Sequence, residues 1–309
     1  MKEIVKVSKN LGTLLIKPIK REIAKTIITQ NHYSKKWNSS FGVINYGIYR
    51  NNKLLGVAVF GNLMNPKSYS SITELGADSI IELNRLWIDD VLGHNAESIL
   101  ISSSFKLIKH NHPNIKFVQS FADGRLGCGT IYKATNFDYF GYSKSLFFES
   151  QVNGETFHKV PLENTMRPLG FLSKNKQYLD NELNPFYVKT YRYIYLLDKK
   201  ANVLLKKEPY PAYDIGIEEI ETYNHSIGLL VRLMIMYNMI GDIDYSIKTL
   251  EHLGELGYSD QRISDEIIIQ NANDSVIHFR DTWLKNRNNV KDYFKSSIKK
   301  KTISLDEFI

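Results

Sequence analysis

The chain has 309 residues, of which 43% are hydrophobic and 24% are charged. This composition is typical of a globular protein and excludes disordered, fibrous and collagen-like chains. The single cysteine, Cys128, excludes an internal disulfide framework and favours the reducing cytosol. The N-terminus has no apolar run of signal-peptide length, and the most apolar stretch, 227–240, is too short to span a bilayer and predicts a buried helix. We therefore expect a cytoplasmic protein without a membrane partner.

The formal net charge of +7 is unevenly distributed along the chain. Residues 1–210 contain 29 Lys and Arg against 17 Asp and Glu, a balance of +12. Residues 211–309 contain 11 against 16, a balance of −5, and the two sum to +7. A basic body is a cue to a polyanionic partner such as nucleic acid, although many basic domains bind none.

In chain order, the pattern first predicts an amphipathic helix over 17–31, with isoleucines spaced by four residues. Two strand-like runs follow at 42–49 and 54–60, and the polar turn between them indicates a hairpin. A further strand is expected over 80–88. The next helix begins at Asn95, a residue suited to capping it.

A strand over 115–121 follows that helix, so the segment from 80 to 121 is predicted to form a βαβ unit. A glycine-rich turn, a short helix over 130–136, aromatic strands and a last strand over 191–197 come next. We predict an α/β (mixed α+β) fold with a central mixed sheet flanked by helices. Ligands in such sheets lie at the carboxyl ends of the strands.

The sequence texture changes after Pro211, where helical patterns with short polar joints extend over 216–298. We expect a catalytic domain over residues 1–211 and a C-terminal helical extension over residues 212–309. The sequence assigns no role to the extension.

None of the common catalytic signatures is present: the chain lacks a P-loop, a G-x-S-x-G turn, an HExxH helix and a paired-cysteine zinc motif. Two polar clusters with aromatic neighbours stand out instead. His32 to Trp37 ends the first helix, where His and Lys also stabilise the helix dipole. Arg85 lies inside an apolar strand, so its guanidinium needs a carboxylate, a carbonyl or a ligand.

Two further clusters lie at the ends of predicted elements. Asn95 and Ser98 begin a helix after a strand, where free N–H groups form an anion site, although capping also explains them. Asp123 precedes a loop with glycines at 124, 127 and 129, which suits close approach of backbone to a ligand, although a plain turn is the alternative. Cys128 has no neighbouring base and is interpreted as structural.

Together, these clusters resemble the Mom family of phage DNA adenine-modification proteins. The resemblance extends from about His32 to Pro211 and rests on five motifs. They are HYS, L-x-R-L-W, N-x-E-S, ADG…G-T-I-Y-x-A-T-N-x-x-Y-x-G and R-Y-x-Y-x-L-D-K-K…Y-P. The resemblance implies a GNAT-like acyltransferase fold and the transfer of a methylcarbamoyl-type group to adenine N6 in double-stranded DNA, which shields phage genomes from restriction. It also implies an acyl-CoA-type donor and an association with iron.

Carried onto this chain, the family's functional residues are His32, Arg85, Ser98, Asp123 and Tyr132, with Tyr33, Ser34, Tyr49 and Tyr139 as second candidates. Arg85, Asn95 and Ser98 are expected to hold the donor. His32 and Asp123 are either general bases or two ligands of a metal. The expected nucleic-acid contacts are Lys35, Lys36, Trp37, Lys67, Arg125, Lys133, Tyr139 and Lys144, with the aromatic members and Tyr132 stacking on a flipped base.

Two rival hypotheses remain at this point. The first is a GNAT N-acetyltransferase of a small amine or protein, which explains the fold but not the basic body. The second is a phage DNA-binding or host-blocking protein without turnover, which is consistent with the missing glycine-rich loop of coenzyme-binding relatives.

Overall fold

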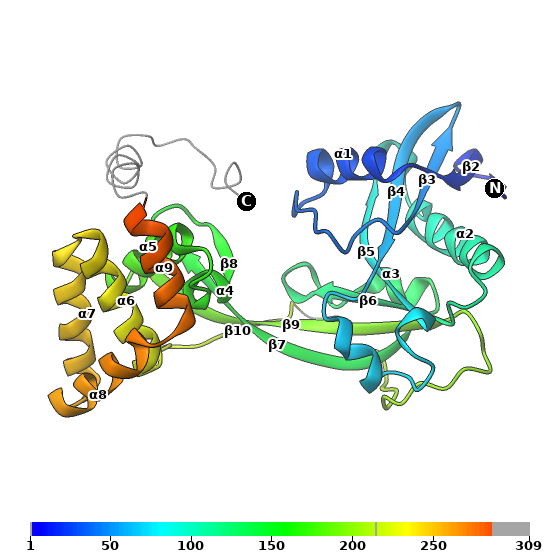
Figure 1. The fold of residues 1–309 in the computed structure, drawn as a ribbon. Helices are drawn as coiled ribbons and strands as arrows, with labels where there is room; N and C mark the ends of the chain where they lie inside the picture. Colours follow the sequence, from blue (N-terminus) through cyan, green and yellow to red (C-terminus); the bar gives the residue numbers. More distant parts are fainter. Residues whose placement is uncertain (1, 214, 286–309) are drawn as a thin grey trace. The chain divides into compact units, whose positions relative to one another are not determined.

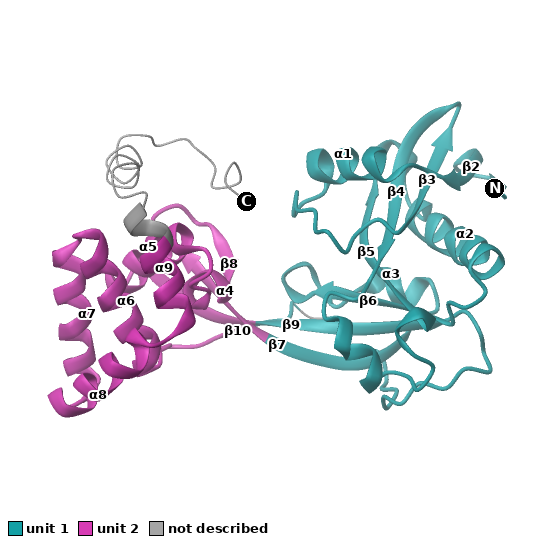
Figure 2. Ribbon diagram, viewed as in Figure 1, with its two compact units in different colours: residues 1–144, 188–217 teal, residues 145–187, 218–309 magenta. Residues whose placement is uncertain are grey.

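The computed structural model describes residues 2–213 and 215–285. These fall into two compact units that interleave along the chain (Figure 2). Unit 1 comprises Met1–Lys144 and Val188–Ile217, and unit 2 comprises Ser145–Tyr187 and Glu218–Ile309. The expected boundary after residue 211 lies inside unit 1. The helices from Ile227 onward belong to unit 2 together with residues 145–187.

Strands dominate unit 1 and supply a mixed sheet (Figure 1). The strands of the chain are β1 (Ile4–Ser8), β2 (Gly12–Pro18), β3 (Ile44–Arg50), β4 (Lys53–Gly61), β5 (Ile80–Ile88), β6 (Phe117–Asp123), β7 (Asp138–Ser150), β8 (Thr156–His158), β9 (Leu183–Leu196) and β10 (Ile217–Glu219). Their order in the sheet is β1-β2-β3-β4-β5-β6-β9-β7-β8, and β10 pairs with β9. β5 and β6 are parallel, whereas the pairs from β1 to β5 and the β6–β9 pair are antiparallel. The predicted mixed sheet flanked by helices is confirmed.

Helices cover the sheet of unit 1 and form most of unit 2 (Figure 1). They are α1 (Arg21–Asn31), α2 (Ala96–Asn111), α3 (Thr130–Ala134), α4 (Val160–Glu163), α5 (Pro168–Leu179), α6 (Ile227–Ile240), α7 (Ile243–Glu255), α8 (Asp260–Asn271) and α9 (Asp274–Lys285). Of the helices expected over 216–298, those from Ile227 to Lys285 are present, whereas Ile217–Glu219 form the strand β10 and 220–226 are not helical. Residues 286–298 lie outside the described residues.

Alternation along β4 places α1 and α2 on opposite faces of the sheet. Val57 and Val59 pack in one cluster with residues of α1, whereas Ala58 and Phe60 pack in another with residues of α2. Successive side chains of a strand point to opposite faces, so one apolar run supports both layers. β5, α2 and β6 form the expected βαβ unit, because β5 and β6 pair in parallel.

Two features of unit 1 differ from the expected elements. The helix expected from residue 17 begins at Arg21, because residues 12–18 form β2 and pair with β1 and β3. The strand expected over 191–197 is β9, which begins at Leu183. Both differences arise because strand pairing depends on distant partners, which local periodicity does not reveal.

Unit 2 is built around α6, the apolar helix that the sequence predicted over the same residues. Its side chains pack with β7, α5, α7, α8 and α9 in one buried cluster. A helix that is apolar on most sides is expected to be surrounded by other elements. Within the described residues, no helix is long and apolar enough to cross a bilayer.

A buried histidine, His225, lies at the edge of this cluster and is 2% exposed. Its Nε2 is 2.7 Å from Oδ1 of Asn175, whose amide nitrogen donates to two carbonyls, so the ring donates through Nε2. The ring also lies against Tyr178 and Tyr223. Burial, and to a lesser extent the charge of His252, lowers the pKa of His225 to about 3.

We expect acid to destabilise unit 2 through this histidine. The unfolded chain binds a proton near pH 6.5, whereas folded His225 resists it until about pH 3, so stability is lost as the pH falls through this window. Urea unfolding followed by circular dichroism between pH 7 and pH 4 measures the effect. His225→Gln keeps a hydrogen-bond donor but cannot titrate. The slope of its unfolding free energy against pH should therefore be shallower than that of the wild type, by up to about 1.4 kcal/mol per pH unit. Equal slopes would contradict this assignment.

A glycine closes the turn between β6 and α3. Gly129 has φ +88°, and an added Cβ would lie 2.8 Å from the Ala122 Cβ, 2.8 Å from Tyr132 and 2.9 Å from Tyr193. Real Cβ atoms essentially never approach so closely, so a larger side chain displaces the turn. The turn of Gly124 to Gly129 therefore needs glycine at this position for both backbone and packing.

Gly129→Ala should destabilise the protein more than Gly241→Ala. Gly241, at the end of α6, is left-handed like Gly129, with φ +77° and ψ +20°, but nothing lies within 4 Å of its Cβ position, so it isolates the backbone cost. We expect that cost to be about 1–2 kcal/mol, with about 1–3 kcal/mol more at Gly129 from overpacking. Urea unfolding of the two variants tests this, and equal losses would show that the turn accommodates the methyl group.

Candidate active site

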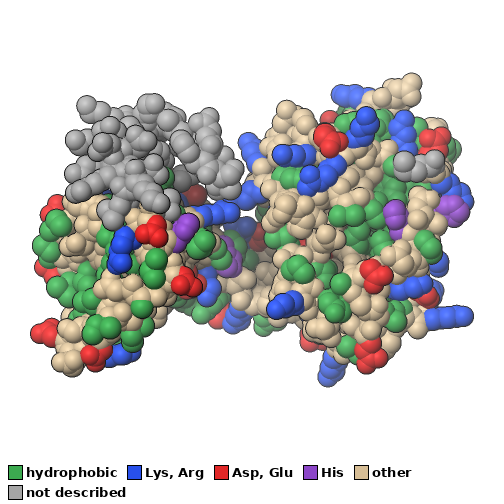
Figure 3. All heavy atoms as spheres, in the orientation of Figure 1, with side chains coloured by type: hydrophobic (Ala, Val, Ile, Leu, Met, Phe, Trp, Pro, Cys, Tyr) green, Lys and Arg blue, Asp and Glu red, His purple; other side chains and the backbone are tan. Residues whose placement is uncertain are grey.

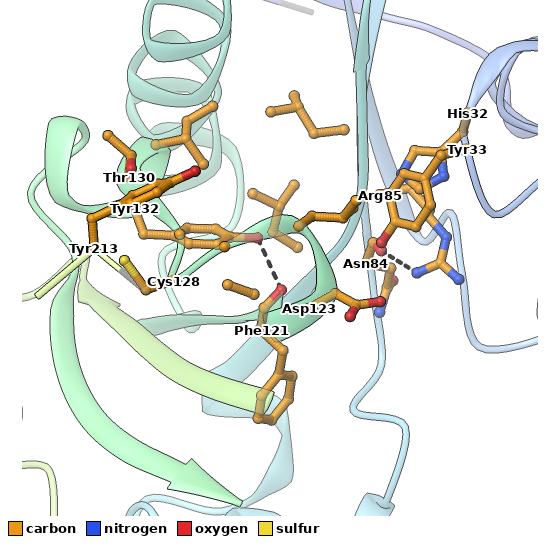
Figure 4. A pocket seen from close by; sticks show the side chains of 17 residues that line it. His32, Tyr33, Asn84, Arg85, Phe121, Asp123, Cys128, Thr130, Tyr132 and Tyr213 are labelled. Atoms are coloured by element: carbon orange, nitrogen blue, oxygen red, sulfur yellow. Dashed lines mark hydrogen bonds between the residues drawn. The ribbon is translucent and has the colours of Figure 1, made fainter. Parts of the chain in front are cut away.

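A cavity opens where β5 and β6 stop pairing. Their parallel register extends from Ile80 with Phe117 to Glu82 with Gln119, and beyond it the Ser120 Oγ lies 2.9 Å from the Leu83 carbonyl oxygen. The cavity has a volume of about 340 Å³ and is lined by 83–86 of β5, 121–123 of β6 and the turn that follows, within unit 1 (Figure 4). Volumes of a few hundred Å³ are typical of ligand sites.

His32 enters this cavity from the end of α1. Its backbone N–H donates to the Ile28 carbonyl, after which the chain leaves helical geometry. The imidazole is 7% exposed, and its Nδ1 lies 2.9 Å from the Ser34 Oγ and 3.1 Å from the Ser34 backbone nitrogen. Burial, with a contribution from the positive charge of Arg85, lowers the pKa of His32 to about 4. The imidazole is therefore neutral near pH 7.

Arg85 reaches the cavity from β5 as an incompletely satisfied cation. Its Nη1 donates to the Asn84 carbonyl at 2.6 Å, and its guanidinium lies 4.6 Å from the centre of the Phe41 ring. Its Nε is buried and has no hydrogen-bond partner in the described structure. Burial lowers the pKa of Arg85, although the charge persists at any ordinary pH. Of the options that the sequence left open, a backbone carbonyl is realised through Nη1, and Arg85 also lines the cavity.

Asp123 lies at the carboxyl end of β6, as the sequence predicted. Its Oδ1 accepts the backbone N–H of Arg125 at 3.0 Å and caps the short 3₁₀ turn Gly124–Leu126. The Arg125 guanidinium also binds it, with Nη2 2.6 Å from Oδ2. The carboxylate is thus oriented from one side, and Figure 4 shows it directed toward the part of the cavity where Arg85 and Tyr33 lie.

Tyr132 of α3 forms the opposite wall. Its ring stacks on Tyr193 at a centroid distance of 4.8 Å, and its hydroxyl lies 3.1 Å from the Phe121 carbonyl and 2.9 Å from the Ser120 Oγ. Burial raises the pKa of Tyr132 to about 12. The phenol therefore remains protonated and acts as a hydrogen-bond donor rather than a base. One face of its ring is already covered by Tyr193.

The structure thus brings together His32, Arg85, Asp123 and Tyr132, along with Tyr33. The centre of the Tyr33 ring lies 4.3 Å from the centre of the His32 imidazole, and Ser34, which does not line the cavity, hydrogen-bonds to that imidazole. Tyr49 does not line the cavity; its ring lies under the Lys17 ammonium, 4.7 Å from it.

The two residues expected at the start of α2 do not line this cavity. Asn95 has φ +72° and its side chain makes no capping hydrogen bond, contrary to the expected cap. The Ser98 Oγ donates to the Asn95 carbonyl at 2.9 Å. A left-handed Asn directs its side chain away from the first turn, and Ser98 takes over part of the local bonding.

A buried polar cluster beside the cavity was missed by sequence reasoning. The Glu82 carboxylate, 5% exposed, accepts from Asn84 at 3.0 Å and from Gln119 at 3.3 Å. Burial raises the pKa of Glu82. The signal was present: β5 carries Glu82 and Asn84 two residues apart on a strand of apolar residues, which indicates a polar stripe on one face. Tyr213 also lines the cavity, but it follows Pro211, where the resemblance to the Mom family ends.

The expected nucleic-acid contacts divide into exposed and packed side chains. Tyr139 is 4% exposed and packs on Tyr191 and Tyr193, and Trp37 packs edge-on against Phe41, so neither presents a free ring face to a base. Arg125 is paired with Asp123. The lysines are exposed to solvent: Lys35, Lys36, Lys67, Lys133 and Lys144. Figure 3 shows Lys and Arg side chains gathered over the region of α1.

The residues at the cavity do not fit a metal centre. Within residues 2–213 and 215–285, no three His, Cys, Asp or Glu side chains gather closely enough to hold an ion. His32 Nδ1 is occupied by Ser34, and the Asp123 carboxylate is held by Arg125. The alternative in which His32 and Asp123 ligate a metal such as iron therefore lacks a third ligand among the described residues.

Solved structures that align with the chain include several acetyltransferases. An N-acetyltransferase from Staphylococcus aureus Mu50 is 14% identical, with 60% of this chain and 97% of that chain covered and a TM-score of 0.33. NAA60 of Arabidopsis thaliana in complex with acetyl-CoA is 11% identical, with 59% and 98% covered and a TM-score of 0.35. At these TM-scores the likeness says nothing about the activity of this chain.

Sequence comparison is more specific. A curated relative from Escherichia phage Mu, named methylcarbamoylase mom, is 35% identical over 211 residues, which cover 64% of this chain and 83% of the relative. The model of the Mom protein family matches residues 13–212, which include every residue that lines the cavity except Tyr213. On the extent of this match and the identity to the phage Mu protein, the chain belongs to the Mom protein family.

Proposed function

We propose that this enzyme transfers a methylcarbamoyl-type acyl group from an acyl-CoA-type donor to the exocyclic N6 of adenine in double-stranded DNA, and that the modification protects phage DNA from restriction in the host cytoplasm. One observation carries the proposal: in a Mom family chain, His32, Arg85, Asp123 and Tyr132 come from four separate segments and line one cavity. The similarity to a methylcarbamoylase supports group transfer as the chemistry.

The cavity suits a base that has left the double helix. An adenine N6 is stacked and paired in the duplex, so the nucleotide must be extruded before its amine is reached. Two aromatic residues at the cavity have largely exposed side chains, Tyr33 at 61% and Tyr213 at 78%. These rings, rather than Trp37 and Tyr139, are free to stack on the extruded base.

The chemistry requires polarisation of the donor and removal of a proton. The lone pair of adenine N6 is delocalised into the ring, so the carbonyl of the donor must be strongly polarised. The Arg85 guanidinium, which lines the cavity as a cation, would hold a polar group of the donor. As N6 bonds to the carbonyl carbon, the bond from that carbon to the sulfur of the donor breaks and the thiolate leaves with its electron pair, while the N6 proton passes to the Asp123 carboxylate, which Arg125 keeps in place.

Basic residues around α1 supply an electrostatic surface for the DNA backbone. Lys20, Arg21 and Lys25 are exposed on or just before the helix that ends at His32. Lys35 and Lys36 are exposed immediately after it. Cations at this place would contact phosphates next to the nucleotide whose base enters the cavity.

Plasmid DNA from cells that express this chain should contain a new adenosine mass, detected by mass spectrometry of digested nucleosides. Asp123→Asn should reduce the modified fraction by about 10²–10⁴-fold, the usual contribution of a positioned base. Asp90→Asn, at an exposed carboxylate after β5, should leave it unchanged. Unmodified DNA with folded wild-type protein would instead favour an acetyltransferase of another amine, or a DNA-binding protein without turnover.

Affinity for a DNA duplex should fall steeply with salt, because contacts to phosphates release counterions. The double variant Lys35→Gln/Lys36→Gln should bind more weakly and lower the slope of log K against log salt by about 2. Lys199→Gln/Lys200→Gln, a second exposed lysine pair, is the matched control and should keep the wild-type slope. Fluorescence anisotropy between about 50 and 200 mM salt measures both slopes. Identical slopes for the two variants would exclude Lys35 and Lys36 from the DNA-binding surface.

A further inference from the structure

The hydrogen bonds of His32 define which ring nitrogen carries its proton. The backbone N–H of Ser34 points at Nδ1 from 3.1 Å, and a backbone N–H is always a donor. The Ser34 Oγ lies 2.9 Å from the same nitrogen. A protonated Nδ1 would place two N–H groups against each other, so Nδ1 must offer its lone pair. In the neutral ring, the hydrogen is then on Nε2.

Nε2 is the free end of this ring. Nε2 has no hydrogen-bond partner among the described residues, and it is not among the polar atoms sealed from solvent. His32 is 7% exposed and lines the cavity (Figure 4), so an accessible and unpaired Nε2 is open to a ligand there. The group presented there is a hydrogen-bond donor without a lone pair.

The surroundings also disfavour a second proton on the ring. Burial and the nearby charge of Arg85 both lower the pKa of His32, to about 4. An imidazole with Nε2–H and an engaged Nδ1 has no basic atom facing the substrate. Removing a proton from adenine N6 would therefore require His32 to break both contacts with Ser34 and change tautomer.

We propose that His32 donates its Nε2–H to the carbonyl oxygen of the transferred group and stabilises the negative charge that develops there, instead of acting as the general base. This inference rests on the proposed function, because it names the oxygen of that reaction. It also separates the two residues that the sequence had left as equivalent bases: His32 binds the oxyanion, and Asp123 takes the proton. The spacing of the H-Y-S motif has a physical explanation, since Ser34 determines which nitrogen of His32 carries the proton.

The first test compares His32→Gln with His32→Ala in the nucleoside assay. A glutamine amide can donate at the place of Nε2 but cannot act as a base. We expect His32→Ala to lose about 10²–10³-fold in rate, as for a lost oxyanion donor, and His32→Gln to recover at least tenfold of that loss. Equal rates for the two variants would overturn the donor role, provided that thermal unfolding shows both to be folded.

A second test reads the tautomer without any activity. Nitrogen-15 NMR of the protein labelled at its 8 histidines distinguishes Nε2–H from Nδ1–H, and the signal absent from His32→Gln identifies His32. We expect the Nε2–H form between pH 6 and 8 in the wild type. The Nδ1–H form would overturn the proposal. If the wild-type chain modified no DNA, the proposed function would fail in the nucleoside assay while this measurement still decided the tautomer.

Discussion

The parallel ladder between β5 and β6 ends after Glu82 and Gln119, and the position of the site follows from that end. Strands that stop exchanging hydrogen bonds must satisfy their carbonyls and amides elsewhere. Here Ser120 lies against the Leu83 carbonyl, and Tyr132 lies against the Phe121 carbonyl, so side chains take over from the ladder. The separation of the two strands creates the cavity, and the hydrogen bonds of Ser120 and Tyr132 that replace the ladder also form part of its wall. The position of the site therefore depends on where the strand pairing ends.

Charge near the cavity is arranged around the same end of the ladder. Glu82 is buried and receives amide donors from both strands, while Arg85, three residues further along β5, lacks a partner for Nε. Burial acts in opposite directions on the two groups, raising the pKa of Glu82 and lowering that of Arg85. Partial burial of a cation without an ion-pair partner among the described residues is costly, so a ligand that accepts a hydrogen bond from the Arg85 guanidinium would also relieve a cost of the folded state.

Unit 2 has a core of its own, centred on α6, and its contribution lies outside the cavity described above. The family match ends at residue 212, yet it includes 145–187, which belong to unit 2. The second unit is therefore partly a family feature and partly an extension that follows it. Long strands explain this division, because β7 and β9 each contribute residues to both units.

The sequence by itself determined the local elements and the family. Periodicity located α6, β5 and the βαβ unit, because burial of one face leaves a regular apolar pattern. The motifs included His32, Tyr33, Arg85, Asp123 and Tyr132, all of which line the cavity, since chemistry demands particular residue types. Only the tertiary structure decided the rest: Asn95 and Ser98 lie away from the cavity, and Tyr139 is in the core. The sequence alone does not show whether an aromatic or polar side chain faces a ligand or the core, because the pairing of strands that are distant in the chain determines its orientation.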